Sequence, residues 1–304
     1  MIHELRLGVL FCVLTAALCS VGRSDEAFIP YEAIEDVAYG HKDGLALTLD
    51  IIEPKTDRNG IGLILVSSGS WISKKSDVPG EEDERRKYDH WMQGLLKGGF
   101  TLFVVRHGSS PKYMVPEMHA DILRSVRFVR ANAERFRVDP LHLGITSGSS
   151  GGHLSLMAAT KGDDGKPDAA DPIERVSSRT QAVVAWFPPT DMVNWNGPKG
   201  FALLAVARPD LFDRMFGEIK DLESQLREIS PIQFVNKDSP PLMLIHGDGD
   251  KTVPIQQSNV MKAKYEEMGL TVKMVVQPGG GHSSWPGIMD QYPIVWDWFK
   301  THLR

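Results

Sequence analysis

Short continuous runs of apolar residues recur along the chain, and each has the length of a β-strand. They are IGLILV at 61–66, FTLFVV at 100–105, LHLGIT at 141–146, AVVAWF at 182–187, LMLI at 242–245 and VKMVV at 272–276. Such runs are typical of strands buried on both faces of a parallel sheet. Ahead of them, alternate apolar residues from Leu45 to Ile51 follow the turn signal Asp43-Gly44 and predict the second arm of a hairpin.

Helical spacing separates these runs. One apolar stripe steps by four and three residues, as an α-helix requires, and consists of Ile122, Val126, Val129, Ala133 and Phe136. Strands that alternate with helices predict an α/β fold, with a mostly parallel central sheet covered by helices on both faces. Ligands of such sheets bind beyond the carboxyl ends of the strands, so the chemistry should follow directly after the apolar runs.

Charged residues on the predicted helices have structural interpretations. Arg124, Arg127 and Arg130 form a row on a second face of the helix just described. This row could bind an anion, but we favour a solvated helix face, because charged rows commonly cover exposed helix faces. The acidic-then-basic run at 81–87 suits the start of another helix, where carboxylates lie near the positive end of the helix dipole.

Composition is that of an ordinary globular protein. The 304 residues are 42% hydrophobic and 24% charged, which excludes a disordered chain and allows one large domain or two small ones. A net charge of −5 gives no electrostatic reason to expect a nucleic-acid partner. No internal repeat is visible, so repeat architectures are also excluded.

The N-terminus has the pattern of a signal peptide. Cys12 and Cys19 lie in the apolar stretch 7–21, which is shorter than the about 20 residues of a membrane span. We expect residues 1–24 to be a leader and residues 25–304 to be the mature domain, without a membrane span and located outside the cell or in the periplasm. An uncleaved anchor or a buried first helix is the alternative.

If cleavage takes place between residues 21 and 26, the mature chain has no cysteine, because the sequence holds only these two. A disulfide scaffold is then excluded. A nucleophile in the mature chain must be a hydroxyl.

A serine-rich turn follows the LHLGIT run. The sequence SGSSGGH at 147–153 would turn a strand sharply into a helix and expose a serine hydroxyl, the nucleophile-elbow arrangement. Two registers are open: Ser150 is central in a strict G-x-S-x-G at 148–152, whereas Ser149 is central if Ser147 replaces the first glycine. A Gly/Ser turn without chemistry is the alternative.

An acid and a base follow the last two runs. HGDGDKTVP at 246–254 contains Asp248 and Asp250, and PGGGH at 278–282 ends in His282. Nucleophile, acid and base thus follow three separate strands in the order Ser, Asp, His, as a catalytic triad for acyl transfer requires. The serine would attack, His282 would take its proton and return it to the leaving group, and a carboxylate would orient the imidazole.

Asp250 is the acid that we favour. Asp248 is interpreted as a residue that accepts backbone amides in a Gly-rich turn. His246 is interpreted as a strand-end histidine bonded to its neighbours, because nothing nearby supplies a set of metal ligands. The loop lacks the Gly and distal Glu of an EF-hand, so we expect neither metal nor cofactor.

Donors for an oxyanion hole should follow the IGLILV run, in SSGSW at 67–71. Backbone amides of Gly69 or Ser70, together with that of Ser150, could hold the developing negative charge. A plain turn in which Trp71 only packs is the alternative.

From about Val37 to its end, the chain resembles the α/β-hydrolase superfamily. Within it, the chain is similar to the esterase/lipase branch that includes hormone-sensitive-lipase-like carboxylesterases and bifunctional acetyl-xylan/feruloyl esterases. The motifs are VDP before SGSSGGHLS, SPIQFV before SPPLMLIHGDGDKTVPIQQS, and GGGH. In this family the serine before a small residue and Gly-Gly-His is the nucleophile, which implies Ser149. Two departures are SSGSW at 67–71, where the family usually has His-Gly-Gly-Gly-Trp, and Ser147 in place of glycine.

An insertion at 191–230 bears on the substrate. Its large apolar residues are Trp195, Phe201, Leu203, Leu204, Leu211, Phe212, Met215 and Phe216. They could form a cap over the nucleophile or merely cover the sheet, and apolar spacing does not separate the two uses. Its modest length favours small or short-chain esters.

The sequence therefore predicts a serine carboxylic-ester hydrolase that acts on a small-molecule or polysaccharide-linked ester, such as acetyl or aromatic acyl groups on polysaccharide. Two alternatives stay open. The HGDGDKTVPIQQS segment also resembles serine peptidases of the prolyl-oligopeptidase type, which normally carry an additional propeller domain. A catalytically inactive binding protein on the same fold is the other.

Overall fold

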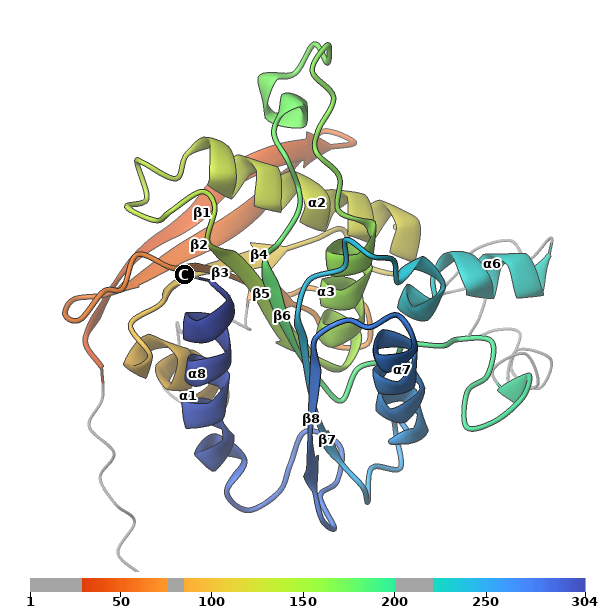
Figure 1. Cartoon of the computed structure of the whole chain (residues 1–304). Coiled ribbons are helices and arrows are strands. Elements are labelled where there is room, and N and C mark those ends of the chain that lie inside the picture. Colours follow the sequence, from red (N-terminus) through yellow and green to blue (C-terminus); the bar gives the residue numbers. More distant parts are fainter. Residues whose placement is uncertain (1–28, 76–84, 201–220, 304) are drawn as a thin grey trace, which may run out of the picture.

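A single mixed sheet forms the centre of the protein. The computed structural model describes residues 29–75, 85–200 and 221–303. Its strands are β1 (Tyr31–Lys42), β2 (Leu45–Pro54), β3 (Gly62–Ser67), β4 (Thr101–Arg106), β5 (Leu143–Gly148), β6 (Ala182–Trp186), β7 (Leu242–Gly247) and β8 (Val272–Gln277). They form one eight-stranded sheet in the order β1-β2-β4-β3-β5-β6-β7-β8. β2 pairs antiparallel with β1 and β4, and all pairs from β4 to β8 are parallel (Figure 1).

Helices cover both faces of this sheet (Figure 1). They are α1 (Arg85–Lys97), α2 (Val115–Ala131), α3 (Ser149–Lys161), α6 (Leu222–Glu228), α7 (Gln256–Glu267) and α8 (Tyr292–His302), with short 3-10 helices at Pro172–Arg175, Pro231–Phe234 and Ile288–Gln291. One buried apolar cluster joins the sheet to α2, α3 and α7, and a second joins it to α1 and α8. The predicted α/β fold with a mostly parallel sheet is confirmed.

Each predicted apolar run lies largely within a strand, and the largest displacement of a strand start has a physical cause. The run at 141–146 was expected to start the strand at Leu141, yet β5 begins at Leu143. Leu141 lies in a turn closed by the hydrogen bond from the His142 amide to the Asp139 carbonyl, 3.1 Å, and is 70% exposed.

The helical stripe continues beyond its helix. α2 ends at Ala131, and the amide of Asn132 bonds back to the carbonyls of Phe128 and Val129. Ala133 and Phe136 are nevertheless buried, in the turn that follows. Apolar spacing therefore predicted burial correctly and overstated the length of the helix.

Several sequence predictions fall outside the described residues. These are the leader at 1–24, the start of the run at 81–87, and the part of the insertion at 201–220 that holds most of its large apolar side chains. In the part of the chain that the structure describes, none of the helices has both the length and the apolar character needed to cross a membrane.

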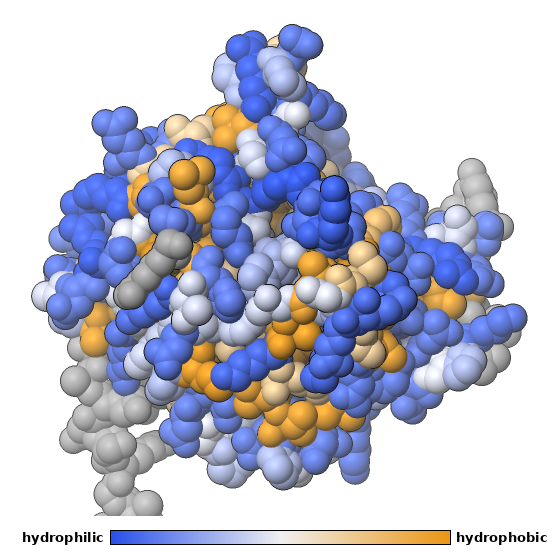
Figure 2. Space-filling model, in the orientation of Figure 1, coloured by the Kyte–Doolittle hydropathy of each residue, from blue (hydrophilic) through white to orange (hydrophobic). Residues whose placement is uncertain are grey.

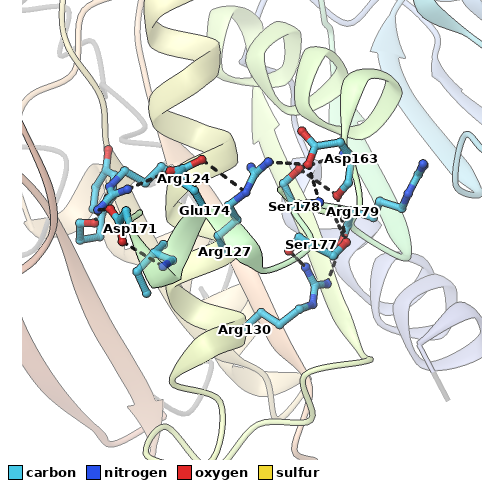
Figure 3. A network of polar contacts seen from close by, with 12 residues as sticks. Arg124, Arg127, Arg130, Asp163, Asp171, Glu174, Ser177, Ser178 and Arg179 are labelled. Atoms are coloured by element: carbon cyan, nitrogen blue, oxygen red, sulfur yellow. Dashed lines mark hydrogen bonds and ion pairs between the residues drawn. The ribbon is translucent and has the colours of Figure 1, made fainter. Parts of the chain in front are cut away.

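The arginine row on α2 does not form a solvated face. Figure 3 shows these side chains reaching from α2 into the connection that follows α3, residues 163–179. The contacts are Arg124 with Asp171 and Glu174, Arg127 with Asp163 and Glu174, and Arg130 with the carbonyls of Pro140, Ser177 and Arg179. Our preferred interpretation of this row is wrong, because a segment distant in sequence folds over the helix and supplies the acceptors.

Arg127 is the most deeply buried of the three, with a side chain that is 3% exposed. We expect Arg127→Met to lower the free energy of unfolding by about 1.5–3 kcal/mol, because it removes charge-assisted contacts of a buried guanidinium with Asp163 and Glu174. The matched control is Arg179→Met, whose ion pair with Asp164 is exposed and should contribute at most about 1 kcal/mol. Chemical denaturation measures both; equal losses would contradict the role assigned to burial.

Candidate active site

The turn between β5 and α3 presents Ser149 in a left-handed backbone conformation. Its φ is 54°, which is unusual for a residue other than glycine. The turn is closely packed: a Cβ on Gly151 would lie 2.1 Å from Ser147 Oγ and 2.8 Å from the Val66 carbonyl. Ser147, which replaces the usual glycine, donates its hydroxyl to that same carbonyl at 2.6 Å. The turn therefore accepts serine at position 147 but needs glycine at 151.

The two registers of the motif have different partners. Ser149 Oγ lies 3.0 Å from His282 Nε2, whereas Ser150 Oγ lies 3.1 Å from Ser68 Oγ. Ser150 is buried, 1% exposed, and Ser149 is partly exposed. Ser149 is thus the serine that the structure brings to the histidine, in agreement with the preferred register.

His282 and Asp250 meet because two glycine-rich loops lie backbone to backbone. His282 Nδ1 lies 2.7 Å from Asp250 Oδ2. The Gly249 amide donates to the Gly280 carbonyl at 2.9 Å, and a Cβ on Gly247 would lie 2.2 Å from that carbonyl oxygen. The loops after β7 and β8 can approach this closely only where side chains are absent.

Hydrogen bonds keep Asp250 ionised although it is buried. Burial alone would raise the pKa of this carboxyl, but donors from His246, His282 and the amides of Val253 and Thr252 outweigh it and hold the pKa well below its ordinary value. The two amides donate to Oδ1 at 2.9 and 2.8 Å, so Oδ2 faces the histidines. A fixed negative charge therefore lies 2.7 Å from His282 Nδ1.

The neighbours of Asp250 take the places expected for them. Asp248 Oδ1 accepts the Gly279 amide, as a turn residue should. His246 is fully buried and bonds to Ser258 Oγ at 2.7 Å and the Val253 carbonyl at 2.9 Å, and its Nε2 lies 3.3 Å from Asp250 Oδ2. Within the described ranges, no cluster of three or more His, Cys, Asp or Glu side chains could hold a metal ion.

The loop at 67–71 adjoins the turn at Ser149 and contains backbone donors. The Gly69 amide donates to the Ile72 carbonyl at 2.9 Å, so that predicted donor is already occupied. Ser150 lies in the first turn of α3, where an amide has no acceptor within its own helix. The amides of Ser70 and Ser150 are the predicted donors that remain.

A cavity of about 540 Å³ opens beside Ser149. Its lining residues are Leu65, Val66, Ser67, Ser68, Gly69, Trp91, Met92, Val104, Ser147, Gly148, Ser149, Phe187, Ser283 and Ser284. This volume is in the range of small-molecule sites. The parallel strands point toward the lower half of the molecule in Figure 1. Figure 2, in the same orientation, shows the larger hydrophobic groups of the visible face in that lower half.

Sequence reasoning missed the aromatic wall of this cavity. The Phe187 ring packs edge-on against the His282 ring, with centroids 4.8 Å apart, and against Trp91 at 6.3 Å. Phe187 closes the apolar run that predicted β6, so its position at a strand end was the available signal. Trp91 lies on α1, whose approach to the site cannot be predicted from local spacing.

Several known proteins with similar sequences are named as esterases. The model of the BD-FAE family matches residues 49–265. The probable carboxylic ester hydrolase LipM of Mycobacterium tuberculosis is 28% identical over 73% of this chain and 49% of its own length, and the esterase LipQ of the same organism is 25% identical over the same shares. The chain therefore spans about half the length of these relatives.

Solved structures extend the comparison. A truncated form of a carbohydrate esterase from gut microbiota superposes with a TM-score of 0.74 at 28% identity, covering 91% of this chain and 98% of that one. A bifunctional GH43-CE protein of Bacteroides eggerthii superposes with a TM-score of 0.73 at 27% identity, covering 90% of this chain and 38% of that one. Both agree with the architecture described above.

The packing at Gly151 gives a test of the turn. We expect Gly151→Ala to lower the free energy of unfolding by about 1–3 kcal/mol, because the added methyl group overlaps Ser147 and the β3 backbone. Gly69→Ala is the control, since a Cβ there meets nothing within 4 Å. Urea denaturation compares the two; a Gly151→Ala protein as stable as the control would contradict the packing argument.

Proposed function

Because the chain belongs to the BD-FAE family, we propose that it is a serine carboxylic-ester hydrolase in which Ser149, His282 and Asp250 form the catalytic triad. The observation that carries this proposal is the continuous path of contacts from Asp250 through His282 to Ser149, at 2.7 and 3.0 Å. Nucleophile and base within hydrogen-bonding distance, with the base oriented by a third group, are the signature of nucleophilic catalysis.

In the first half of the reaction, Ser149 Oγ attacks the ester carbonyl carbon while His282 Nε2 takes the hydroxyl proton. The oxygen of the tetrahedral intermediate carries a negative charge, which the Ser150 amide and the 67–71 loop stabilise together with the dipole of α3. Each such donor contributes roughly 3–4 kcal/mol in well-studied hydrolases. The intermediate collapses as His282 returns the proton to the leaving alcohol, and the acyl group stays on Ser149.

In the second half, a water molecule takes the place of the alcohol. His282 accepts a proton from this water as its oxygen attacks the acyl carbon, and the same oxyanion donors stabilise the second tetrahedral intermediate. Release of the carboxylic acid returns the proton from His282 to Ser149 Oγ. Asp250 stays ionised throughout and orients the imidazole.

We propose that the substrate is a small or short-chain ester, with acyl groups on polysaccharide as one natural source. The cavity beside Ser149 is far larger than an acetyl group requires, and Leu65, Met92 and Val104 give it an apolar part suited to an acyl group. Carbohydrate esterases are among the structures to which the chain is similar. An exported enzyme would meet such a substrate, which accords with the leader expected at residues 1–24.

Fluorophosphonate labelling tests the triad. We expect the wild-type protein to be labelled and Ser149→Ala to be unlabelled, with turnover reduced about 10⁴-fold or more. Asp250→Asn should lose about 10⁴-fold in turnover because the imidazole is left in the wrong tautomer. Asp248→Asn is its matched control and should keep most of its turnover. An unlabelled wild type would indicate a binding protein, and a label that persists in Ser149→Ala would reassign the nucleophile.

A substrate panel tests the bond that is cleaved. We expect p-nitrophenyl acetate and butyrate to be hydrolysed faster than laurate or longer acyl esters, because the insertion at 191–230 is too modest in length to enclose a long acyl chain. Acetylated xylan and methyl ferulate test the polysaccharide-linked esters, and peptide anilides test peptidase activity. Hydrolysis of the anilides alone, without ester hydrolysis, would overturn the esterase proposal.

A further inference from the structure

His153 has no part in the mechanism above, yet it connects three segments around the nucleophile. It is fully buried on α3, four residues after Ser149 and therefore on the same side of the helix. Its Nδ1 accepts the indole N–H of Trp71 at 3.0 Å, and its Nε2 lies 2.7 Å from the Ile229 carbonyl. The rings of Trp71 and His153 also meet edge to face, with centroids 5.6 Å apart.

These contacts determine the state of the imidazole. The indole N–H can only donate, so Nδ1 must be unprotonated and Nε2 must carry the proton that is donated to Ile229. Burial lowers the pKa of His153 to about 4, against a smaller opposite effect of the Ile229 carbonyl. His153 is therefore a neutral ring of one tautomer, suited to holding its partners in place and unsuited to proton transfer near neutral pH.

The partner of His153 belongs to the loop in which oxyanion donors are expected. Ser70 and Trp71 both have left-handed backbone conformations, with φ of 51° and 59°. Residues other than glycine keep such a conformation only when their surroundings enforce it. The Trp71 carbonyl accepts the Ser110 amide at 3.1 Å, and the indole is held by His153, so both ends of this residue are anchored.

We propose that His153 is a positioning residue for the oxyanion hole, acting through its hydrogen bond from Trp71 to hold the loop at 67–71 against the turn at Ser149. This inference rests on the proposed esterase function. The hydrogen-bonding distance between Ser68 and Ser150 is a second link between the same loop and the same helix. With both links in place, the loop amides and the α3 amides have a fixed relation before substrate arrives, as preorganised stabilisation of an oxyanion requires.

Two single variants and their combination test the inference. Trp71→Phe removes the indole N–H but keeps an aromatic ring, and His153→Leu removes the acceptor. We expect each to lower kcat about 10- to 100-fold per active site titrated with fluorophosphonate, with KM changed less than about threefold, because the lost interaction acts in the transition state. The double variant should be no slower than the slower single variant, because both changes break one interaction.

Affinity for phenylboronic acid, which forms a tetrahedral adduct on the nucleophilic serine, should fall in parallel with kcat. His153→Gln, whose amide offers both an acceptor and a donor, should restore most of the rate. Trp298→Phe is the matched control: this buried indole N–H on α8 has no partner within the described residues, so its removal should leave kcat unchanged.

The outcomes separate the two proposals. A wild type that is not labelled by fluorophosphonate rejects the esterase function itself. Normal labelling with losses in the single variants that multiply in the double variant would overturn only the role of His153. Unchanged kcat per titrated site in Trp71→Phe and His153→Leu would overturn it as well, since a merely structural residue reduces the number of active molecules and leaves their turnover intact.

Discussion

The left-handed backbone at Ser149 is the constraint around which the rest of the site is built. A non-glycine residue with a φ of 54° costs roughly 1–3 kcal/mol, so the surrounding structure must enforce the conformation. It does so by close packing: glycine at 151 lets the helix start against β3, and a Cβ on Gly148 would lie 2.9 Å from the Phe187 ring. The bend at this turn places the Ser149 hydroxyl beyond the end of β5, next to the first backbone amides of α3.

The surroundings of this turn give Asp250 and His153 one stable protonation state each. Asp250 is surrounded by donors, His282 among them, and stays ionised. His153 is surrounded by an apolar core, an indole N–H and a carbonyl, and stays neutral. The two histidines thus have different surroundings: His282 contacts Ser149 and Asp250 and would change its charge in the proposed reaction, whereas His153 stays neutral.

The sequence predicted the strands from short apolar runs. It predicted that Ser149, Asp250 and His282 lie close together because each follows the end of such a strand. Buried parallel strands are continuous apolar runs, and the carboxyl ends of such strands converge whatever the loops between them contain. Contacts between distant segments could not be predicted in this way. Most acceptors of the arginine row lie in residues 163–179, and the approach of Trp91 depends on how α1 packs. The bond between the Gly69 amide and the Ile72 carbonyl is local, but only the folded loop reveals it.

This difference explains why the chemistry is easier to infer than the substrate. The proposed catalytic groups each follow a strand closely, so the sheet determines their positions. The cavity, in contrast, is formed by the ends of β3 and β4, the helix α1, Phe187 after β6 and the loop that carries His282. Its shape therefore depends on side chains that no single segment specifies. Because Phe187 lines the cavity and packs against the His282 ring, a substitution that reshapes the pocket there also changes the surroundings of this histidine. In the proposed reaction, selectivity for the acyl group and the rate of proton transfer are therefore coupled at this residue.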